Sequence, residues 1–268
     1  MPQRIARAVL AQLLVVSTGC ALLMHKPGWQ ERRLRTPMAE QIATRYGIGH
    51  FRDIEAIRFT FHAQADGRSI ERSWVWQPAS DIVTLEAAAK TSPMPLPAPY
   101  HRGRHSWWPA HRAKQRQVDQ WFINDQYWLL FPFHLVWDDH VTVLADGLRT
   151  LPIGPGAAEH VEVTYDEDTG YTPGDVYELF VDPNLLIQQW VYHKGGSAAP
   201  TRIATWERHV QAGPLTVSTE HHGPNGFHVW FTGVAVRMRH SKEWLAAPDP
   251  SATMKPAEPI APAPVTPR

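Results

Sequence analysis

The second half of the sequence alternates short apolar segments with turn-forming residues, and this pattern limits the fold more than any other feature. The segments predict strands at residues 141–144, 160–165, 176–181, 186–193, 202–210, 215–221 and 227–238. Turn-formers rich in glycine, proline, aspartate and asparagine separate them, at residues 146–147, 173–175, 182–184, 195–196, 213–214 and 223–226. Because short connections join neighbouring strands, we expect these strands to pair antiparallel.

The first half adds a helix and further strands. Apolar residues at helical spacing predict a helix over residues 38–46, ended by the glycines that follow it. Residues 57–63 alternate apolar with polar side chains, as a strand with one buried face does. An Asp-Gly turn at residues 66–67 leads to a return strand at 70–76, and a third strand is predicted at 81–85. With about ten strands in all, the sheet must curl or close.

The most apolar stretch of the predicted domain runs from Trp121 to Trp137. Residues 127–133 contain four aromatic residues, two leucines and Pro132. We predict a helix over about 110–124 and a break at Pro132, since a proline inside a helix removes a hydrogen bond. After this pivot the chain returns to the sheet near residue 141. The stretch is therefore expected to lie across the mouth of the curved sheet, as a lid.

The N-terminus has the pattern of an export signal. Two arginines precede an apolar run at residues 8–16, and small residues then lead to Cys20, the only cysteine. This order is that of a bacterial lipoprotein signal, in which the thiol receives a lipid, although Ser17 stands where leucine is usual. Two alternatives remain: an uncleaved anchor over residues 8–24, or a cytosolic protein with a chance apolar end.

Both the lipoprotein and the anchor would place the rest of the chain on the far side of the membrane, because arginines before an apolar run stay inside. We expect the periplasmic side of a Gram-negative bacterium. Residue 21 is alanine rather than aspartate, which in similar lipoproteins allows transfer to the outer membrane. The expected tether covers residues 21–37. Residues 246–268 are rich in proline and alanine and have too little apolar surface to fold.

Charge and motifs argue against several functions. The chain has 26 basic and 26 acidic residues, which gives no electrostatic reason to expect a nucleic-acid partner. It has no Gly-x-Ser-x-Gly, phosphate-binding glycine loop, His-Glu-x-x-His or paired-cysteine motif. We expect no catalytic residue, cofactor or metal.

Histidines were considered as metal ligands in three places. The best candidate is Asp138 with His140 and His134, but a turn or solvated strand entry is the simpler interpretation. The histidines of residues 91–116 belong to a basic, proline-rich loop. The pair at residues 221–222 adjoins a turn and is expected to be solvated.

Several segments resemble a known group of proteins. They are YTPGDVYELFVDPNLLIQQWVY at residues 171–192, DQYWLLFPFHL at 125–135, Tyr46-Gly47-x-Gly49 and Thr205-Trp206-Glu207. Over roughly residues 38–240 the chain resembles uncharacterised bacterial lipoproteins with a domain similar to the LolA/LolB lipoprotein carriers. The resemblance implies a mainly β (α+β) fold over residues 38–245. This is an incomplete, strongly curved antiparallel barrel with helices closing its mouth, around an apolar cavity for acyl chains.

Three functions are compatible with these features. The first is an exported protein, anchored to the membrane through lipidated Cys20, whose hydrophobic cavity binds a lipid or an acylated partner. Its candidate cavity or lid residues are Trp76, Trp121, Tyr127, Trp128, Leu130, Phe131, Phe133, Trp190 and Trp230. The second is a structural or interaction module with a filled core. The third, which we rank last, is a hydrolase with dispersed catalytic residues, so the protein is not expected to be an enzyme.

Overall fold

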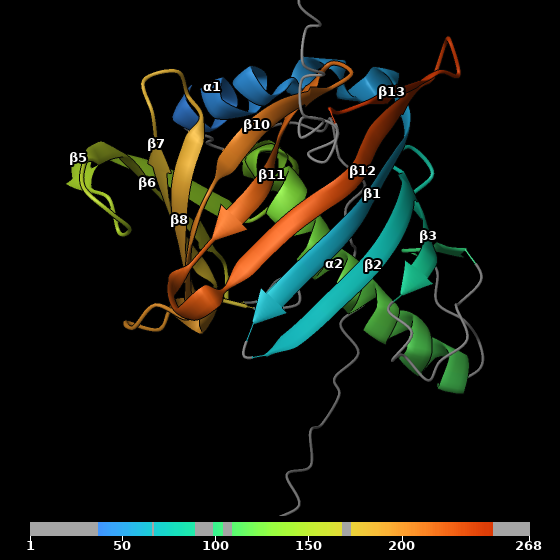
Figure 1. Cartoon of the computed structure of the whole chain (residues 1–268), viewed down its shortest axis with the longest axis horizontal. Helices are drawn as coiled ribbons and strands as arrows, with labels where there is room; N and C mark the ends of the chain where they lie inside the picture. The colour runs from blue at the N-terminus through green and yellow to red at the C-terminus, as the bar shows by residue number, and fades with distance from the viewer. Residues whose placement is uncertain (1–36, 66, 89–98, 104–108, 168–172, 249–268) are drawn as a thin grey trace, which may run out of the picture.

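The fold was analysed in a computed structural model that describes residues 37–65, 67–88, 99–103, 109–167 and 173–248 (Figure 1). The predicted signal peptide with Cys20 and all but the last residue of the tether lie outside these residues. So do Asp66 of the predicted turn, much of the basic loop and the tail from residue 249.

The described strands form two antiparallel sheets. The larger contains β1 (Ile54–Ala65), β2 (Arg68–Gln77), β3 (Ile82–Ala88), β4 (Tyr100–His101), β10 (Glu207–Ala212), β11 (Leu215–His222), β12 (His228–Met238) and β13 (Trp244–Ala246). The smaller contains β5 (Val141–Thr150), β6 (Ala157–Tyr165), β7 (Val176–Val181), β8 (Ile187–His193) and β9 (Arg202–Thr205). Every predicted strand is found. The predicted number of about ten strands is too low, because the short strands β4 and β13 were not predicted and one predicted strand is divided into two.

The order of strands leaves both sheets open. The larger sheet runs β10-β11-β12-β1-β2-β3-β4, with β13 beside β12, and the smaller runs β5-β6-β7-β8-β9. No pairing joins β4 to β5 within the described residues, and both sheets contribute to one hydrophobic core. The prediction of a mainly β, incomplete antiparallel barrel is confirmed.

The chain passes from one sheet to the other at Trp206. We predicted one strand over residues 202–210, but β9 ends at Thr205 and β10 begins at Glu207. The Trp206 backbone N–H donates to the carbonyl of Gln188 in β8 at 2.6 Å, whereas β10 pairs with β11. The side chain of Trp206 is buried in the core at this bend.

Helix α2 (Pro109–Trp137) lies on the inner face of the larger sheet and passes behind β12, β1 and β2 in Figure 1. The predicted end near residue 124 and the predicted break at Pro132 are both wrong, since the helix continues to Trp137. An internal proline costs about 3 kcal/mol. Each large apolar side chain that is fully buried contributes roughly 1.5–3 kcal/mol. Five are completely buried around the proline, at Leu129, Leu130, Phe131, Phe133 and Leu135, so burial outweighs the lost hydrogen bond.

Helix α1 (Pro37–Tyr46) confirms the first predicted helix, and the 3-10 turn η1 (Ile48–Asp53) follows it. The buried Tyr46 hydroxyl accepts a hydrogen bond from the backbone N–H of Ile187 at 3.0 Å. Gly47 has φ +100°, and a Cβ there would lie 2.4 Å from the carbonyl oxygen of Pro214. The Tyr-Gly pair of the motif therefore joins α1 to both sheets.

One predicted turn is a bulge. Residues 146–147 lie inside β5, where the pairing with β6 shifts register between Ala145 and Leu148. Gly147 has φ +94°, a conformation that suits a bulge better than a regular strand. No helix among the described residues combines the length and apolar character needed to cross a membrane.

Candidate functional site

An aromatic cluster lies where α2 meets the smaller sheet. The ring of Trp128 in α2 is 4.4 Å from that of Trp190 in β8 and 5.6 Å from that of Phe227, which precedes β12. One helical turn on, the Phe131 ring is 4.8 Å from Tyr177 in β7. The Tyr177 and Trp190 rings in turn stack on each other at 5.2 Å. Side chains from α2 and both sheets thus form one apolar lining.

Three ring nitrogens in and beside this cluster are buried without a hydrogen-bond partner among the described residues. They are Nε1 of Trp190, Nε1 of Trp206 and Nε2 of His221. The Trp206 ring lies 6.0 Å from that of Trp190 and 4.8 Å from that of His221. A buried polar group left unpaired costs about 1–3 kcal/mol, and most such groups in native proteins are paired. Three such nitrogens thus lie in one neighbourhood of the core, where a buried water or a polar group of a ligand could pair with them.

The protonation state of His221 defines what that partner must offer. Its Nδ1 lies 3.1 Å from the Thr205 carbonyl oxygen, so Nδ1 carries the proton and donates, and Nε2 keeps its lone pair. Burial lowers the pKa of His221 to about 3, so the ring is neutral at pH 7. The site therefore presents two N–H donors and one acceptor, with no charge. A hydroxyl or amide group, which both donates and accepts, fits this set.

Polar contacts hold the middle of α2 to the larger sheet. The fully buried Asp125 accepts two hydrogen bonds from Arg72, and a third from Trp74 Nε1 at 2.8 Å. Burial raises the pKa of the Asp125 carboxyl, against the opposite effect of the Arg72 contact. Six residues earlier in α2, Asp119 accepts a hydrogen bond from Arg102 Nε at 2.9 Å. Ionic contacts thus fix α2 on an otherwise apolar surface.

The residues considered for a metal at the end of α2 do not converge. His134 Nδ1 lies 2.9 Å from Asp138, and His134 Nε2 lies 3.0 Å from Gln126. Burial alone would raise the pKa of Asp138, but His134 and the hydroxyls of Tyr127 and Tyr165 hold it below its usual value. His140 instead faces the carboxylate of Asp166 at 3.3 Å, apart from this network.

The structure brings most of the predicted cavity or lid residues together. Six are buried in the one core: Trp76, Trp128, Leu130, Phe131, Phe133 and Trp190. Trp121 and Tyr127 are partly buried and pack against it. The prediction that Trp230 lines the interior is wrong. Its neighbours Val229 and Phe231 face the core, so Trp230 projects from the opposite face, where it stacks on His62 and His228.

Two residues of the candidate site, Trp206 and His221, are not among the predicted cavity or lid residues. Trp206 belongs to the Thr205-Trp206-Glu207 motif, and the expectation that His221 is solvated is wrong, since it is fully buried. The signal was present in residues 215–221. Leu215, Val217 and His221 share one parity, and a strand places side chains of one parity on the same face.

A pocket of about 130 Å³ lies elsewhere, beside Arg58 and Gly233 near β13. Ligand pockets usually measure about 300–1,000 Å³, so this one is small for a binding site. The aromatic cluster with its three unpaired nitrogens remains the candidate site.

No family model matches the chain, and no curated protein matches it. Among solved structures it is similar to a DUF1329 family protein from Desulfovibrio piger, with 10% identity and a TM-score of 0.41 over 75% of this chain and 93% of that one. It is also similar to a LolA superfamily protein from Nitrosomonas europaea, with 8% identity and a TM-score of 0.41 over 73% of this chain and 92% of that one. With TM-scores below 0.5, function must be inferred from the residues of this chain.

Proposed function

We propose that the protein is an exported, membrane-anchored carrier that binds an amphipathic molecule, with an apolar chain and an uncharged polar group, between α2 and the sheets. The observation that carries this proposal is the presence of three unpaired ring nitrogens, on Trp190, Trp206 and His221, in an aromatic core. The hydroxyl or amide group of a lipid would meet the nitrogens, while its chain would lie along the aromatic rings.

The energetic gain from such a ligand is sufficient. Burying a twelve-carbon chain contributes on the order of 10 kcal/mol at about 0.8 kcal/mol per methylene, before ordering costs. The polar group adds hydrogen bonds to nitrogens that otherwise have none among the described residues. Because those groups are uncharged, the site favours a neutral headgroup over a carboxylate or a phosphate.

Entry of the ligand requires α2 to move, since its rings contact both sheets. Such movement breaks the ionic contacts of Asp119 and Asp125 and returns their charges to water. A buried ion pair is often no more stable than apolar residues of the same volume, because both charges must leave water on docking. Separating an interface held by such pairs therefore costs less free energy than separating a wholly apolar one.

Export and anchoring rest on the N-terminal residues. Two arginines, an apolar run and small residues before Cys20 support lipidation on the periplasmic side, with the outer membrane favoured. A Cys20→Ala variant should then appear in the soluble fraction of cells. If it stays in the membrane, the apolar segment over residues 8–24 is an uncleaved anchor and the lipidation proposal fails.

A second function is favoured by one observation. Rings from α2 already fill the space that a ligand would take, as the contacts of Trp128 and Phe131 describe. On this alternative the protein is an interaction module with a filled core. In neither case do we assign it an enzymatic activity.

Native mass spectrometry of the chain from residue 21 onward distinguishes the two. A carrier should co-purify with a lipid or take up a fluorescent fatty alcohol, whose hydroxyl suits the site. A Trp190→Phe/Trp206→Phe variant replaces each indole with a smaller aromatic ring that has no N–H donor, and should weaken binding by 10-fold or more. Trp244→Phe on β13, which makes the same change outside the cluster, should not. A clean apo mass with no uptake by the wild-type chain would refute the carrier and leave the interaction module.

A further inference from the structure

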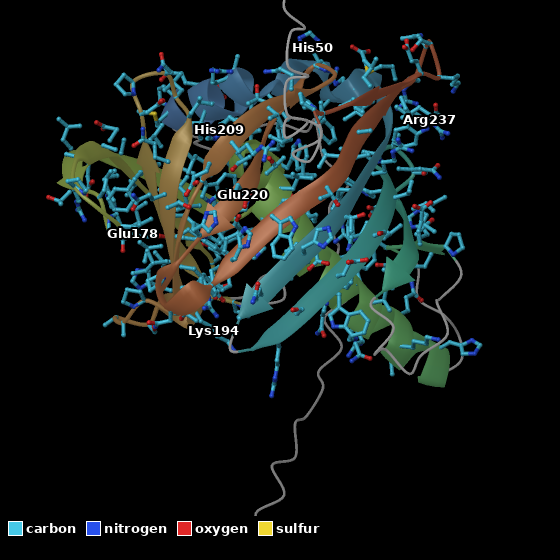
Figure 2. The ribbon with its side chains drawn as sticks, in the orientation of Figure 1. His50, Glu178, Lys194, His209, Glu220 and Arg237 are labelled. Atoms are coloured by element: carbon cyan, nitrogen blue, oxygen red, sulfur yellow. The ribbon has the colours of Figure 1, made fainter. Side chains whose placement is uncertain are left out.

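We propose that Glu220, His222 and His228 form a binding site for a divalent transition-metal ion, Zn²⁺ in particular, on the outer face of the larger sheet. One ligand atom from each lies within 4.8 Å of the other two. Figure 2 labels Glu220 at this face of β11 and β12. The site is independent of the proposed carrier function, because its side chains project away from the core that contains the aromatic cluster.

The strands place the three side chains together by register. Glu220 and His222 are two residues apart on β11, so they project from the same face of the sheet. His222 is paired directly with His228 on β12. The intervening His221 points the other way, into the core. The end of β11 thus places one histidine in the core and the next on the outer face.

The connection between the two histidines is short and tied down. The Gly223 backbone N–H donates to the Phe227 carbonyl at 2.8 Å, across the 3-10 turn η3 (Pro224–Gly226). A Cβ at Gly223 would lie 2.5 Å from the carbonyl oxygen of Ile203, so the backbone there packs closely against β9. The two imidazoles are therefore presented from a fixed hairpin, and a metal ion would not have to order a loop.

One carboxylate oxygen already faces both imidazoles. Glu220 Oε1 lies 2.6 Å from His228 Nε2 and 3.7 Å from His222 Nε2. Two histidines and one glutamate are a ligand set that zinc uses in sites with an open fourth position. Tetrahedral ligands at zinc bond lengths lie roughly 3.3 Å apart, so the widest spacing must close by about 1.5 Å, which side-chain rotation can supply.

A fourth residue orients one of the ligands. Glu207 Oε1 lies 3.4 Å from His222 Nδ1. A carboxylate near that nitrogen favours the tautomer in which Nδ1 is protonated and Nε2 is free for a metal, as outer carboxylates do in zinc sites. The second imidazole, that of His228, is held in place by stacking on Trp230, with the ring centroids 4.4 Å apart. Since His222 is about half exposed, with a side-chain exposure of 49%, an ion and its water ligand can reach the site from solvent.

The two imidazoles already lie side by side. The rings of His222 and His228 stack with their centroids 4.4 Å apart and their planes within 7° of parallel. Both therefore meet the Glu220 carboxylate from the same side of the hairpin, at 3.7 and 2.6 Å.

The test is titration of the full chain, stripped of metal by chelation, with Zn²⁺ in calorimetry and with Co²⁺ in visible spectroscopy. We expect one ion bound with a Kd in the micromolar range or below, and the intense absorption of tetrahedral Co²⁺. His222→Ala and Glu220→Gln should each weaken binding at least 10-fold, and Glu207→Gln about 10-fold. His140→Ala is the matched control, because His140 also faces one exposed carboxylate, that of Asp166, and should leave binding unchanged.

Circular dichroism of each variant establishes that it is folded, which these outer-face substitutions should permit. The proposal is overturned if the wild-type chain and the His222→Ala variant bind Zn²⁺ equally. It is also overturned if Co²⁺ gives only the weak spectrum of octahedral coordination. Equal loss of binding in His140→Ala would point to nonspecific histidine binding and would likewise contradict the site.

Discussion

Arg72 on β2 and Asp125 in α2 form a buried two-point contact, in which Nε and Nη2 of the guanidinium donate to the two carboxylate oxygens at 2.6 and 2.5 Å. Asp125 is completely buried and the Arg72 side chain is 11% exposed, so neither group has much water to compensate for a lost partner. This contact fixes the rotation of α2 about its axis and its position along the sheet. It is also the first contact that must break if α2 moves away.

Removing only one partner should therefore be severe. We expect Arg72→Met to lower the free energy of unfolding by about 3–5 kcal/mol, because Asp125 is left buried without its cation. Urea denaturation at pH 7, followed by tryptophan fluorescence, measures the loss. The double variant Arg72→Met/Asp125→Leu should recover most of it, short of the hydrogen bond that Trp74 loses. A single variant within 1 kcal/mol of the wild type would contradict the importance of the pair.

The same double variant probes ligand entry. An apolar contact in place of the ion pair docks α2 without moving charges out of water, so the carrier hypothesis predicts slower uptake of a fluorescent fatty alcohol. Stopped-flow fluorescence gives the rate. Uptake as fast as in the wild type would indicate that α2 does not open at this contact.

His221 should make stability depend on pH in a defined direction. Burial lowers its pKa to about 3 in the fold, against 6.5 in the unfolded chain. A histidine with a depressed pKa contributes stability that is complete above pH 6.5 and is lost as the pH falls toward 3, at up to about 1.4 kcal/mol per pH unit. His221→Gln does not titrate. The stability advantage of the wild type over this variant should therefore shrink between pH 7 and pH 4, as measured by urea denaturation at each pH. Parallel curves would show that the pKa of His221 is the same in the folded and the unfolded chain, and would contradict its burial as a neutral ring.

Glu178, on the outer face of the smaller sheet, should also make the stability of the fold depend on pH in the acid range. Burial alone would raise its pKa, but hydrogen bonds from His193 and His160, at 2.7 and 2.9 Å, hold the pKa below the ordinary value of 4.5. A carboxyl with a lowered pKa contributes stability above its unfolded value, and this is lost as the pH falls through the folded value. Glu178→Gln should thus destabilise the fold at pH 7 and matter little near pH 3. Thermal unfolding at both pH values measures the difference, and equal losses would contradict the charged network.

Much of the fold could be predicted from the sequence because strands and turns are encoded locally. The alternation in residues 57–63 fixes which side of β1 is buried, and turn-formers fix where most strands end. The path of α2 could not be predicted in this way. The free-energy cost of a proline inside a helix, about 3 kcal/mol, depends only on the local backbone. The larger gain from burying the apolar side chains around it depends on both sheets.

The candidate sites could be predicted less well, for a similar reason. Adjacent histidines at 221 and 222 look alike in sequence. The parity that His221 shares with Leu215 and Val217 favours it as the buried one, and the pairing of β11 with β12 places it in the core. That register also brings His228 beside His222 and Glu220, which precede it by six and eight residues in a hairpin whose alignment depends on η3. Trp206 lies in the candidate site because the chain changes from one sheet to the other at this residue. No local sequence pattern predicts that change.

Gly47 provides the last prediction, and it concerns a motif on which the resemblance to LolA-type proteins rests. Its φ of +100° disfavours any side chain, and a Cβ would lie 2.4 Å from the Pro214 carbonyl oxygen, a backbone atom that cannot turn aside. Gly47→Ala should therefore lower the free energy of unfolding by about 2–4 kcal/mol, from strain plus displacement of the turn between β10 and β11. Gly49→Ala is the matched control, because no atom lies within 4 Å of the Cβ it would add, and it should change stability by less than about 1 kcal/mol. Urea denaturation of both variants makes the comparison. If the two glycines prove equally tolerant, the motif does not have the structural role assigned here, and its function must be sought in a partner that recognises it.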